Sequence, residues 1–401
     1  MRKFPLLPIF LIVAVDVLGL TIMIPLLPFY AEKLGASPSQ VGWLVSVYAL
    51  CQLFSGPLLG RLSDRTGRKP LLIVSQIGTL IGFLVTAWAG TLGMVFLGRI
   101  IDGATAGNLS LAQAYISDVT KPEERAKSFG IIGIAFGLGF LIGPAVSGFL
   151  STYDYRYPIY AAALMSFTSI LATTFLLPSA SSVPPKQGEP TGPGGKRLSL
   201  VAWGAYARYF KRPELGNLLF QFLTFTFSFA MFVSALPLFV ERRLTWNGRP
   251  FGPEQTGYAW AYAGFMGIFL QGPALGRLVK RFGEAALTRI GFAAYGIGYV
   301  MLAFCHSVPW LVASMTALVL GGLVRPTLTS SITQRTSRDE QGVVLGLTQS
   351  LNSVSQIVAP PLAGWMIQHN LLTGWGLVIA AVSITGLMLA ARPAGVAARN
   401  A

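Results

Sequence analysis

The sequence carries very little charge for its length. Only 11% of its 401 residues are Asp, Glu, Lys or Arg, whereas 53% are hydrophobic. A soluble domain carries about 25% charged residues, so this chain has too little charge to solvate a globular surface of its size. The composition therefore argues against an ordinary soluble domain.

Cysteine and catalytic motifs are also scarce. The two cysteines, Cys51 and Cys305, fall in apolar stretches, where a free cysteine packs as a small hydrophobic residue. The sequence contains no nucleotide-binding loop, no metal-ligand cluster and no catalytic triad, and the longest polar segment, 178–214, supplies none. We therefore expect no cofactor and no enzymatic activity.

What the sequence has in abundance is long apolar blocks. About 20 apolar residues in a helix span the roughly 30 Å hydrocarbon core of a bilayer. The blocks predict an all-α membrane protein with twelve transmembrane helices, at 5–29, 40–60, 71–91, 93–116, 128–150, 157–177, 215–240, 256–276, 286–305, 308–331, 342–368 and 371–391.

The distribution of basic residues explains the net charge of +15. With the N-terminus on the cytoplasmic side, most of the 30 lysines and arginines fall in inner segments. The positive-inside rule then places both termini in the cytoplasm. The charge thus reports topology, and we expect no nucleic-acid partner. The outer loops hold only Lys33, Arg156, Arg242, Arg243 and Arg249.

The chain also repeats itself. Residues 56–67 read GPLLGRLSDRTG and residues 272–283 read GPALGRLVKRFG, a spacing of 216 residues that recurs between Pro144 and Pro360. Two parallel six-helix repeats describe one large class of secondary transporters. We predict an N-terminal half at 1–177, a cytoplasmic linker at 178–214 and a C-terminal half at 215–401. Within the linker, 199–212 is either a short amphipathic helix on the inner leaflet or plain linker.

The loop between the second and third spans has a specific pattern. It reads GRLSDRTGRK from Gly60, and this resembles the G-x-x-x-D-R-x-G-R-[RK] signature of the major facilitator superfamily. A close-packed turn would account for its glycines. The resemblance implies that a charged cluster closes the cytoplasmic side in the outward-open state. The implied gating residues are Gly60, Asp64, Arg65, Gly67, Arg68 and Asp118.

A second signature lies in the fifth span. In the same superfamily, a G-x8-G-x3-G-P-x2-G-G pattern marks proton antiporters, and here Ser147 replaces one glycine. A glycine face lets helices approach closely, and a proline leaves a backbone carbonyl unpaired. The alternative is that these residues serve ordinary helix packing only. The matching residues are Gly130, Gly139, Gly143, Pro144 and Gly148.

The whole chain is similar to the drug–proton antiporter branch that includes tetracycline exporters. The stretches beginning at Asp16, Ala114 and Glu124 carry this likeness. Those exporters have further carboxylates in spans three and nine, whereas residues 71–91 and 286–305 contain neither Asp nor Glu. This departure argues against tetracycline itself as the substrate.

Two acids fall deep within predicted spans. Asp16 and Asp102 lie near the middle of the first and fourth spans, and an ionisable residue at that depth marks a functional site. Arg99 lies three residues before Asp102, on the same helical face. Either Arg99 and Asp102 form a pair that only fixes packing, or Arg99 belongs to the superfamily's proton-handling motif. Asp16, with no basic partner in its own helix, is the predicted proton-coupling group.

The second copy of the loop exchanges its charges. Lys280 stands where Asp64 stands in the first copy, and Glu284 replaces Arg68. We expect Lys280 and Glu284 to form a weak pair four residues apart, so that the first loop dominates gating.

These features favour a proton-coupled exporter of small amphipathic molecules that works by alternating access. The alternative is a transporter of lipid-like or sugar substrates, uncoupled or sodium-coupled. The expected partners are a small-molecule substrate, protons and membrane lipid, and we expect a monomer.

Overall fold

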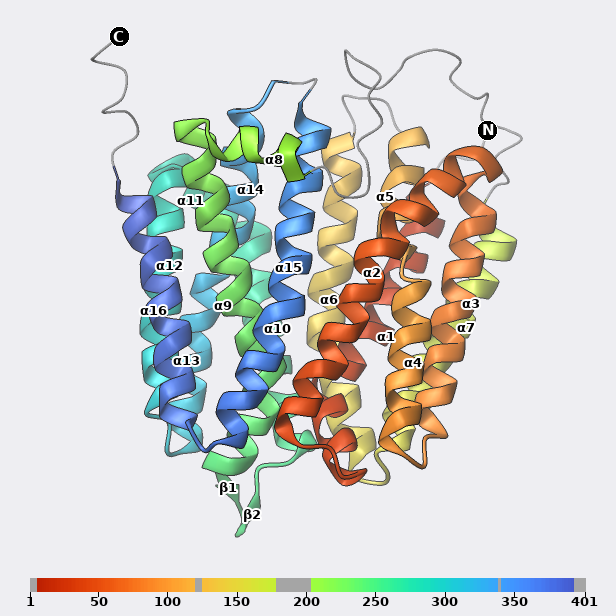
Figure 1. Cartoon of the computed structure of the whole chain (residues 1–401), viewed down its shortest axis with the longest axis vertical. Helices are drawn as coiled ribbons and strands as arrows, with labels where there is room; N and C mark the ends of the chain where they lie inside the picture. The colour runs from red at the N-terminus through yellow and green to blue at the C-terminus, as the bar shows by residue number, and fades with distance from the viewer. Residues whose placement is uncertain (1–5, 120–124, 178–202, 338–339, 393–401) are drawn as a thin grey trace.

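The computed structural model describes residues 6–119, 125–177, 203–337 and 340–392 (Figure 1). The chain folds into long, roughly parallel helices with one small hairpin at the end of the molecule opposite its termini. The first group of helices is α1 (Leu6–Lys33), α2 (Pro38–Thr66), α3 (Arg68–Ala87), α4 (Leu92–Ala104), α5 (Asn108–Val119), α6 (Arg125–Ser151) and α7 (Arg156–Leu176). The second group is α8 (Trp203–Phe210), α9 (Pro213–Arg243), α10 (Pro253–Phe269), α11 (Leu275–Phe282), α12 (Glu284–Ala303), α13 (Val308–Gly321), α14 (Val324–Gln334), α15 (Gln341–Gln368) and α16 (Leu372–Ala391). The hairpin consists of β1 (Thr245–Trp246) and β2 (Arg249–Pro250).

Each of the twelve predicted spans is helical in the described part of the chain, and nine are by themselves long and apolar enough to cross a membrane. The fourth is broken at 105–107 between α4 and α5, and the tenth at 322–323 between α13 and α14. The eighth contains a π-helical turn, Leu270–Ala274, between α10 and α11. The breaks in the fourth and tenth spans lie at equivalent places in the two sequence copies.

The break in the fourth span is stabilised by a neighbouring helix. Ser75 of α3 donates to the carbonyl of Thr105 and accepts from the amide of Gly107 at 2.9 Å. Inside a bilayer no water satisfies freed backbone groups, so a side chain must do so. Ser75 therefore lets the helix be interrupted at membrane depth.

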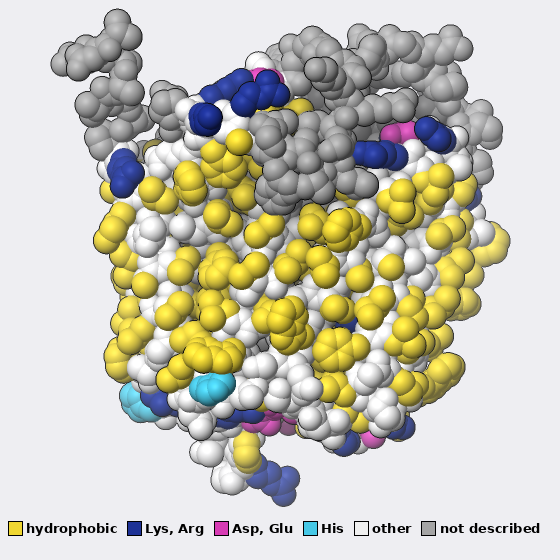
Figure 2. All heavy atoms as spheres, in the orientation of Figure 1, with side chains coloured by type: hydrophobic (Ala, Val, Ile, Leu, Met, Phe, Trp, Pro, Cys, Tyr) yellow, Lys and Arg dark blue, Asp and Glu magenta, His cyan; other side chains and the backbone are white. Residues whose placement is uncertain are grey.

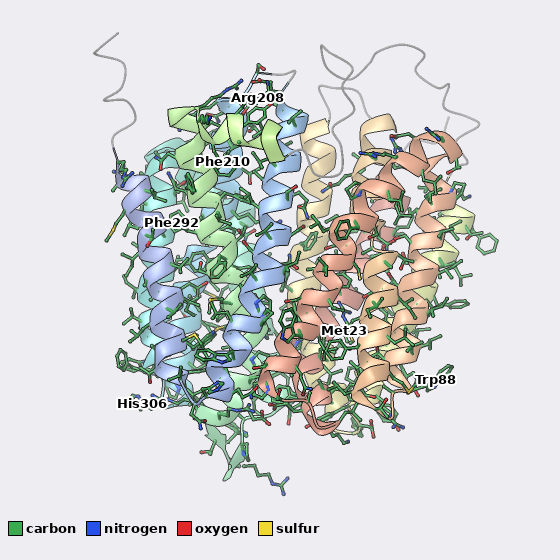
Figure 3. The ribbon with its side chains drawn as sticks, viewed as in Figure 1. Met23, Trp88, Arg208, Phe210, Phe292 and His306 are labelled. Atoms are coloured by element: carbon green, nitrogen blue, oxygen red, sulfur yellow. The ribbon has the colours of Figure 1, made fainter. Side chains whose placement is uncertain are left out.

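The helices form two packed groups. Helices α1 to α7 pack on one another, as in the α1–α6, α1–α7 and α3–α7 pairs, and α9 to α16 do the same. The predicted boundaries of the halves stay a prediction, because residues 178–202 lie outside the described part. Within the predicted linker, α8 is a helix: Phe210 packs edge-to-face on Phe220 of α9 with ring centroids 5.2 Å apart, whereas Arg208 is exposed (Figure 3).

The first seam between the two groups joins α6 to α10. A Cβ on Gly148 would lie 2.8 Å from the carbonyl oxygen of Glu254, and one on Gly257 would lie 2.4 Å from that of Pro144. A Cβ on Gly264 would lie 2.5 Å from the carbonyl oxygen of Phe140, four residues before Pro144. Proline removes the amide that would occupy that carbonyl, so α10 approaches an unpaired backbone acceptor.

The second seam, between α15 and α2, repeats this arrangement. A Cβ on Gly364 would lie 2.2 Å from the carbonyl oxygen of Pro38, and one on Gly42 would lie 2.3 Å from that of Pro360. Pro360 and Pro361 free the carbonyls four residues earlier, and Ser46 of α2 donates to one of them, that of Ile357, at 2.7 Å. Both seams thus bring bare backbone against backbone.

The seams hold the molecule together toward the hairpin end. There, the amide of Ser39 donates to Gln368 of the opposite group at 3.3 Å. Toward the end that carries the termini, α5 packs on α1, α2, α3 and α6, whereas α14 packs on α9, α12 and α15. The main contacts of α5 and α14 in the described chain therefore lie within their own groups, and the described conformation is closed at the hairpin end.

The surface fits a membrane protein. Figure 2 shows hydrophobic side chains in a broad band around the middle, with lysines, arginines and acids gathered at the two ends. Large apolar side chains such as Phe175, Leu58 and Ile297 are well exposed in helices that lie within this band. Contiguous exposed apolar surface of this extent is stable only against lipid.

We predict that a methyl group at Gly364 opens the α2–α15 seam. Overpacking of this kind costs about 1–3 kcal/mol, so Gly364→Ala should raise the population that is open at the hairpin end. The measurement is the distance between spin labels at Trp43 and His369, in a background without Cys51 and Cys305. Gly346→Ala in the same helix is the control, because its Cβ would meet nothing within 4 Å. Equal shifts in the two variants would refute the role of the seam.

Candidate functional site

A buried ion pair lies inside the first group of helices. Arg99 Nη1 of α4 lies 2.9 Å from Asp102 Oδ2, and both side chains are less than a tenth exposed. The Arg99 guanidinium also lies over the ring of Tyr48 of α2, 4.2 Å from its centroid. The predicted same-face spacing is therefore confirmed as a contact. Because a buried charge is expensive without its partner, each member holds the other in place.

Asp16 lies on α1 beside α3 and α7. Its carboxylate accepts hydrogen bonds from Ser169 of α7 and Gln76 of α3, and Gln76 Nε2 also lies 2.7 Å from Ser169 Oγ. The charged group that acts on Asp16 is Asp102, whose own side chain is hydrogen-bonded to Thr79. Two carboxylates thus share one region with a single arginine, and like charges this close disfavour double ionisation.

This polar cluster, defined as Asp16, Gln76, Arg99, Asp102 and Ser169, contains unpaired atoms. In the described chain, Gln76 Oε1 and Arg99 Nε are buried without a hydrogen-bond partner. Each such atom costs about 1–3 kcal/mol, and orphaned buried polar groups are concentrated at functional sites. Gln76 and Ser169 were not predicted as site residues, although a glutamine inside an apolar span is itself a signal of a functional site.

The interior of the second group is aromatic. The rings of Tyr295 and Tyr299 in α12 are stacked with centroids 5.5 Å apart, and Phe232 of α9 contacts both Tyr299 and Trp260 of α10. Arg325, near the start of α14, is exposed and interacts electrostatically with Tyr295. The two groups thus contribute different chemistry: charge from the first and aromatic surface from the second.

The loop at the start of α3 is built around one ion pair. Arg68 Nη1 lies 2.6 Å from Asp64 Oδ1 and also donates to Ser63 Oγ at 2.6 Å. Gly67 has φ of +94°, a conformation that side chains rarely adopt. Gly60 does not fit the expected close-packed turn, because a Cβ there would meet nothing within 4 Å in this conformation. Arg65 is exposed in the same turn.

The second copy of the loop corrects one prediction. Glu284 does not pair with Lys280; its carboxylate accepts hydrogen bonds from Ser330, from Ser331 at 3.0 Å and from Gln334 Nε2 at 3.0 Å, all of α14. Helix α12 begins at Glu284, two residues before the predicted span, and three donors on one neighbouring helix outcompete an exposed lysine. Glu284 and Gln334 are the repeat equivalents of Arg68 and Asp118.

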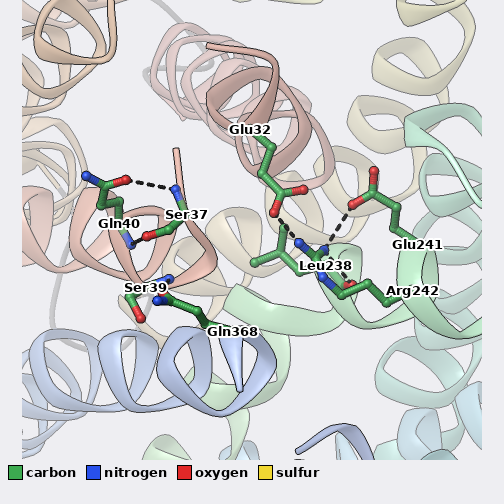
Figure 4. Close-up of polar contacts among 8 residues, drawn as sticks. All are labelled: Glu32, Ser37, Ser39, Gln40, Leu238, Glu241, Arg242 and Gln368. Atoms are coloured by element: carbon green, nitrogen blue, oxygen red, sulfur yellow. Dashed lines mark hydrogen bonds and ion pairs between the residues drawn. The ribbon is translucent and has the colours of Figure 1, made fainter. Parts of the chain in front are cut away.

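An ion pair also joins the two groups at the hairpin end (Figure 4). Arg242 Nη2 of α9 lies 2.5 Å from Glu32 Oε1 of α1, and its Nη1 lies 3.1 Å from Glu241 Oε2 and 3.1 Å from the carbonyl of Leu238. The Arg242 and Glu32 side chains are 28% and 17% exposed, so water screens the pair only in part. The sequence analysis assigned no role to these residues.

Comparison with known proteins decides the family. The sequence profile of the Major Facilitator Superfamily matches residues 9–360 and, separately, 248–399. The chain belongs to the major facilitator superfamily. It is 30% identical over 379 residues to the class G tetracycline resistance protein of Vibrio anguillarum, covering 93% of each chain. It is 29% identical over 379 residues to the class B protein of Escherichia coli, covering 92% of this chain and 90% of that one.

Solved structures agree on the fold. The crystal structure of the human organic anion transporter MFSD10 (TETRAN) superimposes with a TM-score of 0.73 at 21% identity, covering 96% of this chain and 98% of that one. The protein is therefore a multi-pass membrane transporter with the major facilitator fold, and it is not an enzyme.

The glycines of the fifth-span superfamily motif lie on two faces of α6. Gly139 and Gly143 face α1. Thr21 Oγ1 of α1 donates to the carbonyl of Gly139 at 2.8 Å, and a Cβ on Gly143 would lie 2.1 Å from Thr21 Oγ1. Pro144 and Gly148 face α10 of the other half. At these positions α6 therefore packs closely on both α1 and α10, because glycine lets the helices approach.

Three further positions belong to the two motifs, and the structure describes only one of them in full. Ser147, which replaces a motif glycine, is fully buried and its hydroxyl has no partner in the described chain. The side chain of Asp118 and the packing of Gly130 lie outside what the structure describes. Their roles in gating and in the antiporter motif stay predictions.

We predict that the Glu32–Arg242 pair stabilises closure at the hairpin end. Arg242→Gln should weaken closure by about 1 kcal/mol, which is about a fivefold rise in the open population, and high salt should reduce the difference. The same pair of spin labels at Trp43 and His369 reports this population. Arg249→Gln removes the same charge from the nearby hairpin and should leave it unchanged; an equal effect would mean that net charge alone matters.

We also predict unequal contributions from the two loops to transport. At equal expression, Asp64→Ala should be severely impaired, Lys280→Ala nearly silent and Glu284→Ala intermediate, because Glu284 accepts three of the hydrogen bonds that tie α12 to α14. Initial transport rates in membrane vesicles measure the order. Equal losses at Asp64 and Lys280 would show that the repeat is functionally symmetric.

Proposed function

We propose that this protein is a proton-coupled exporter of small amphipathic molecules in the inner membrane of a bacterium. The proposal of proton coupling rests chiefly on one feature of the first half. This feature is the polar cluster of Asp16, Gln76, Arg99, Asp102 and Ser169. Ionisable residues at this depth are costly and mark ion pathways in transporters. The names of the two tetracycline resistance relatives support export of a drug-like molecule.

The orientation follows from charge. The positive-inside rule places both termini in the cytoplasm, so the hairpin end faces outward. In that orientation the described conformation is closed to the outside, and its two seams and the Glu32–Arg242 pair form the outer closure. Substrate would enter from the cytoplasm in this state and leave after the seams exchange for contacts at the opposite end.

Asp16 is the group that we assign to the proton. It lies among neutral donors, whereas Asp102 has Arg99 as its ion-pair partner. When Asp16 is charged, Gln76 and Ser169 donate to it; when it is protonated, its repulsion with Asp102 is relieved. Arg99 favours the charged form of Asp102, and a charged Asp102 would in turn favour proton binding by Asp16. The Asp16–Asp102 repulsion therefore couples protonation to packing among α1, α3, α4 and α7.

The aromatic second half suits an amphipathic substrate. The Tyr295–Tyr299 stack and the neighbouring Phe232 and Trp260 form an aromatic interior without a carboxylate of their own; they are buried in this conformation and would contact a substrate only when the helices around them rearrange. Tetracycline itself is not the substrate that we propose, because α3 contains no acid and the one acid of α12, Glu284, is bound to α14.

We predict that Asp16→Asn uncouples the transporter. In inverted vesicles it should abolish uptake driven by a pH gradient, while leaving exchange of labelled against unlabelled substrate intact, because binding and movement need no proton on this residue. A growth-inhibition panel in a pump-deficient host identifies the substrate beforehand. Asp154→Asn, an acid in the loop before α7, is the matched control and should retain both activities.

Concentrative, gradient-driven transport by Asp16→Asn would refute the assignment of Asp16. Transport by the unaltered protein that is indifferent to a pH gradient would instead refute proton coupling altogether and favour an uncoupled or sodium-coupled transporter.

A further inference from the structure

A lateral pocket opens between α10 and α13 at the hairpin end, away from the polar cluster. Its volume is about 390 Å³, within the range of small-molecule sites. Aromatic side chains form much of its wall: Trp246 of β1, Phe251, and Tyr258 and Tyr262 of α10. Val312 and Met315 of α13 close the other side.

One charge lies in this wall. Glu254, in the first turn of α10, is half-buried and lines the pocket together with Gln255. Gln255 Nε2 donates to Glu254 Oε2 at 3.2 Å and the Tyr258 hydroxyl donates to Oε1 at 3.4 Å. These neutral donors hold the carboxylate in place without neutralising it. Among the residues that line the pocket, Glu254 is the only charged one.

The pocket therefore has two complementary features. A negatively charged side chain is favoured at a helix N-terminus, and the tyrosine and tryptophan rings around Glu254 present negative faces. Both attract a cation, and the apolar remainder of the wall suits a hydrocarbon body. Tryptophan and tyrosine at this level are typical of the membrane–water interface, where an amphiphile concentrates.

The pocket also touches the seam between the halves. The carbonyl of Glu254 is the atom against which Gly148 of α6 packs, and a Cβ on Gly148 would lie 2.8 Å from it. A ligand on the Glu254 side chain thus binds to the same residue whose carbonyl forms this seam contact.

We propose that this pocket binds an ammonium group carried by an apolar body, with Glu254 as its counter-ion and Trp246 and Tyr258 as its aromatic wall. Two sources share this chemistry, the amine headgroup of phosphatidylethanolamine and a free amphipathic amine. The site is independent of the proposed direction and coupling of transport.

Thiol protection tests the site directly. Val312, 42% exposed in the pocket wall, is replaced by cysteine in a background without Cys51 and Cys305. The purified full-length protein is placed in phosphatidylglycerol nanodiscs, and the rate of labelling by N-ethylmaleimide is measured with and without dodecylammonium. We expect dodecylammonium to slow labelling at least fivefold, and dodecyl sulfate at the same concentration to leave it unchanged. Phe304→Cys, exposed at the same end but outside the pocket, is the control and should not be protected.

The carboxylate is tested in the same assay. Glu254→Gln should raise the dodecylammonium concentration needed for half-protection at least tenfold, and Trp246→Leu should raise it severalfold. Glu340→Gln, which removes one charge at the opposite end, should change nothing. Size-exclusion chromatography shows whether each variant is folded. If either Glu254→Gln or Trp246→Leu fails to fold, the other still tests the site.

The lipid composition of the nanodiscs distinguishes a bound lipid headgroup from a free amine. Slow labelling in phosphatidylethanolamine nanodiscs without added amine, reversed by Glu254→Gln, identifies the lipid headgroup as an occupant. Fast labelling there, with protection only by dodecylammonium, identifies a free amine. Protection by neither, protection by dodecyl sulfate to the same extent, or protection that survives Glu254→Gln would overturn the proposal.

Discussion

Contact between bare backbones at two seams is the constraint on which the rest of this structure depends. At α6–α10 and at α2–α15, glycines lie against carbonyl oxygens of the opposite half, and prolines leave further carbonyls unpaired beside them. In lipid there is no hydrophobic drive to join helices, so close packing and satisfied backbone groups must hold the halves together. Where glycine meets carbonyl, these contacts are tight yet contain no interlocking side chains. They can therefore separate and re-form as the halves rock, which side chains packed ridge into groove would resist.

The two halves share a fold but have different interiors. The first half buries an arginine, an acid and a glutamine beside the half-buried Asp16, and the second buries a cluster of tyrosines, phenylalanines and a tryptophan. Duplication therefore conserved what the membrane demands, namely helix lengths, breaks and seams, while the interiors diverged. The loops diverged in the same way: Arg68 pairs with an acid, whereas its equivalent Glu284 accepts from serines and a glutamine. In each half the first residue of the third span carries the contact, but Arg68 binds to the end of α2 whereas Glu284 binds to α14.

Much of the fold followed from sequence because a bilayer allows few solutions. Apolar length predicted every helical span, and the spacing of 216 residues predicted the repeat that the two seams display. The Arg99–Asp102 pair was also predictable, because three residues on a helix bring side chains to one face. The partners of Asp16 were not, since Gln76 and Ser169 come from helices whose rotation a single sequence does not specify. The Lys280–Glu284 pair failed for a related reason: local spacing suggested it, and donors on α14 outcompeted it.

The sequence by itself determined the helices and their membrane environment. Hydrophobic length, basic loops and motif glycines are local properties, and each segment partitions between lipid and water according to its own composition. Only the tertiary structure decided which helix faces meet. It turned Gly148 toward Glu254, joined Glu32 to Arg242 and placed Glu254 in an aromatic wall. These residues are separated by more than 100 positions or lie on helices whose rotation is set by packing across the whole bundle. A helix can place any of its faces toward a neighbour, and the choice is made by the sum of contacts with all of its neighbours together.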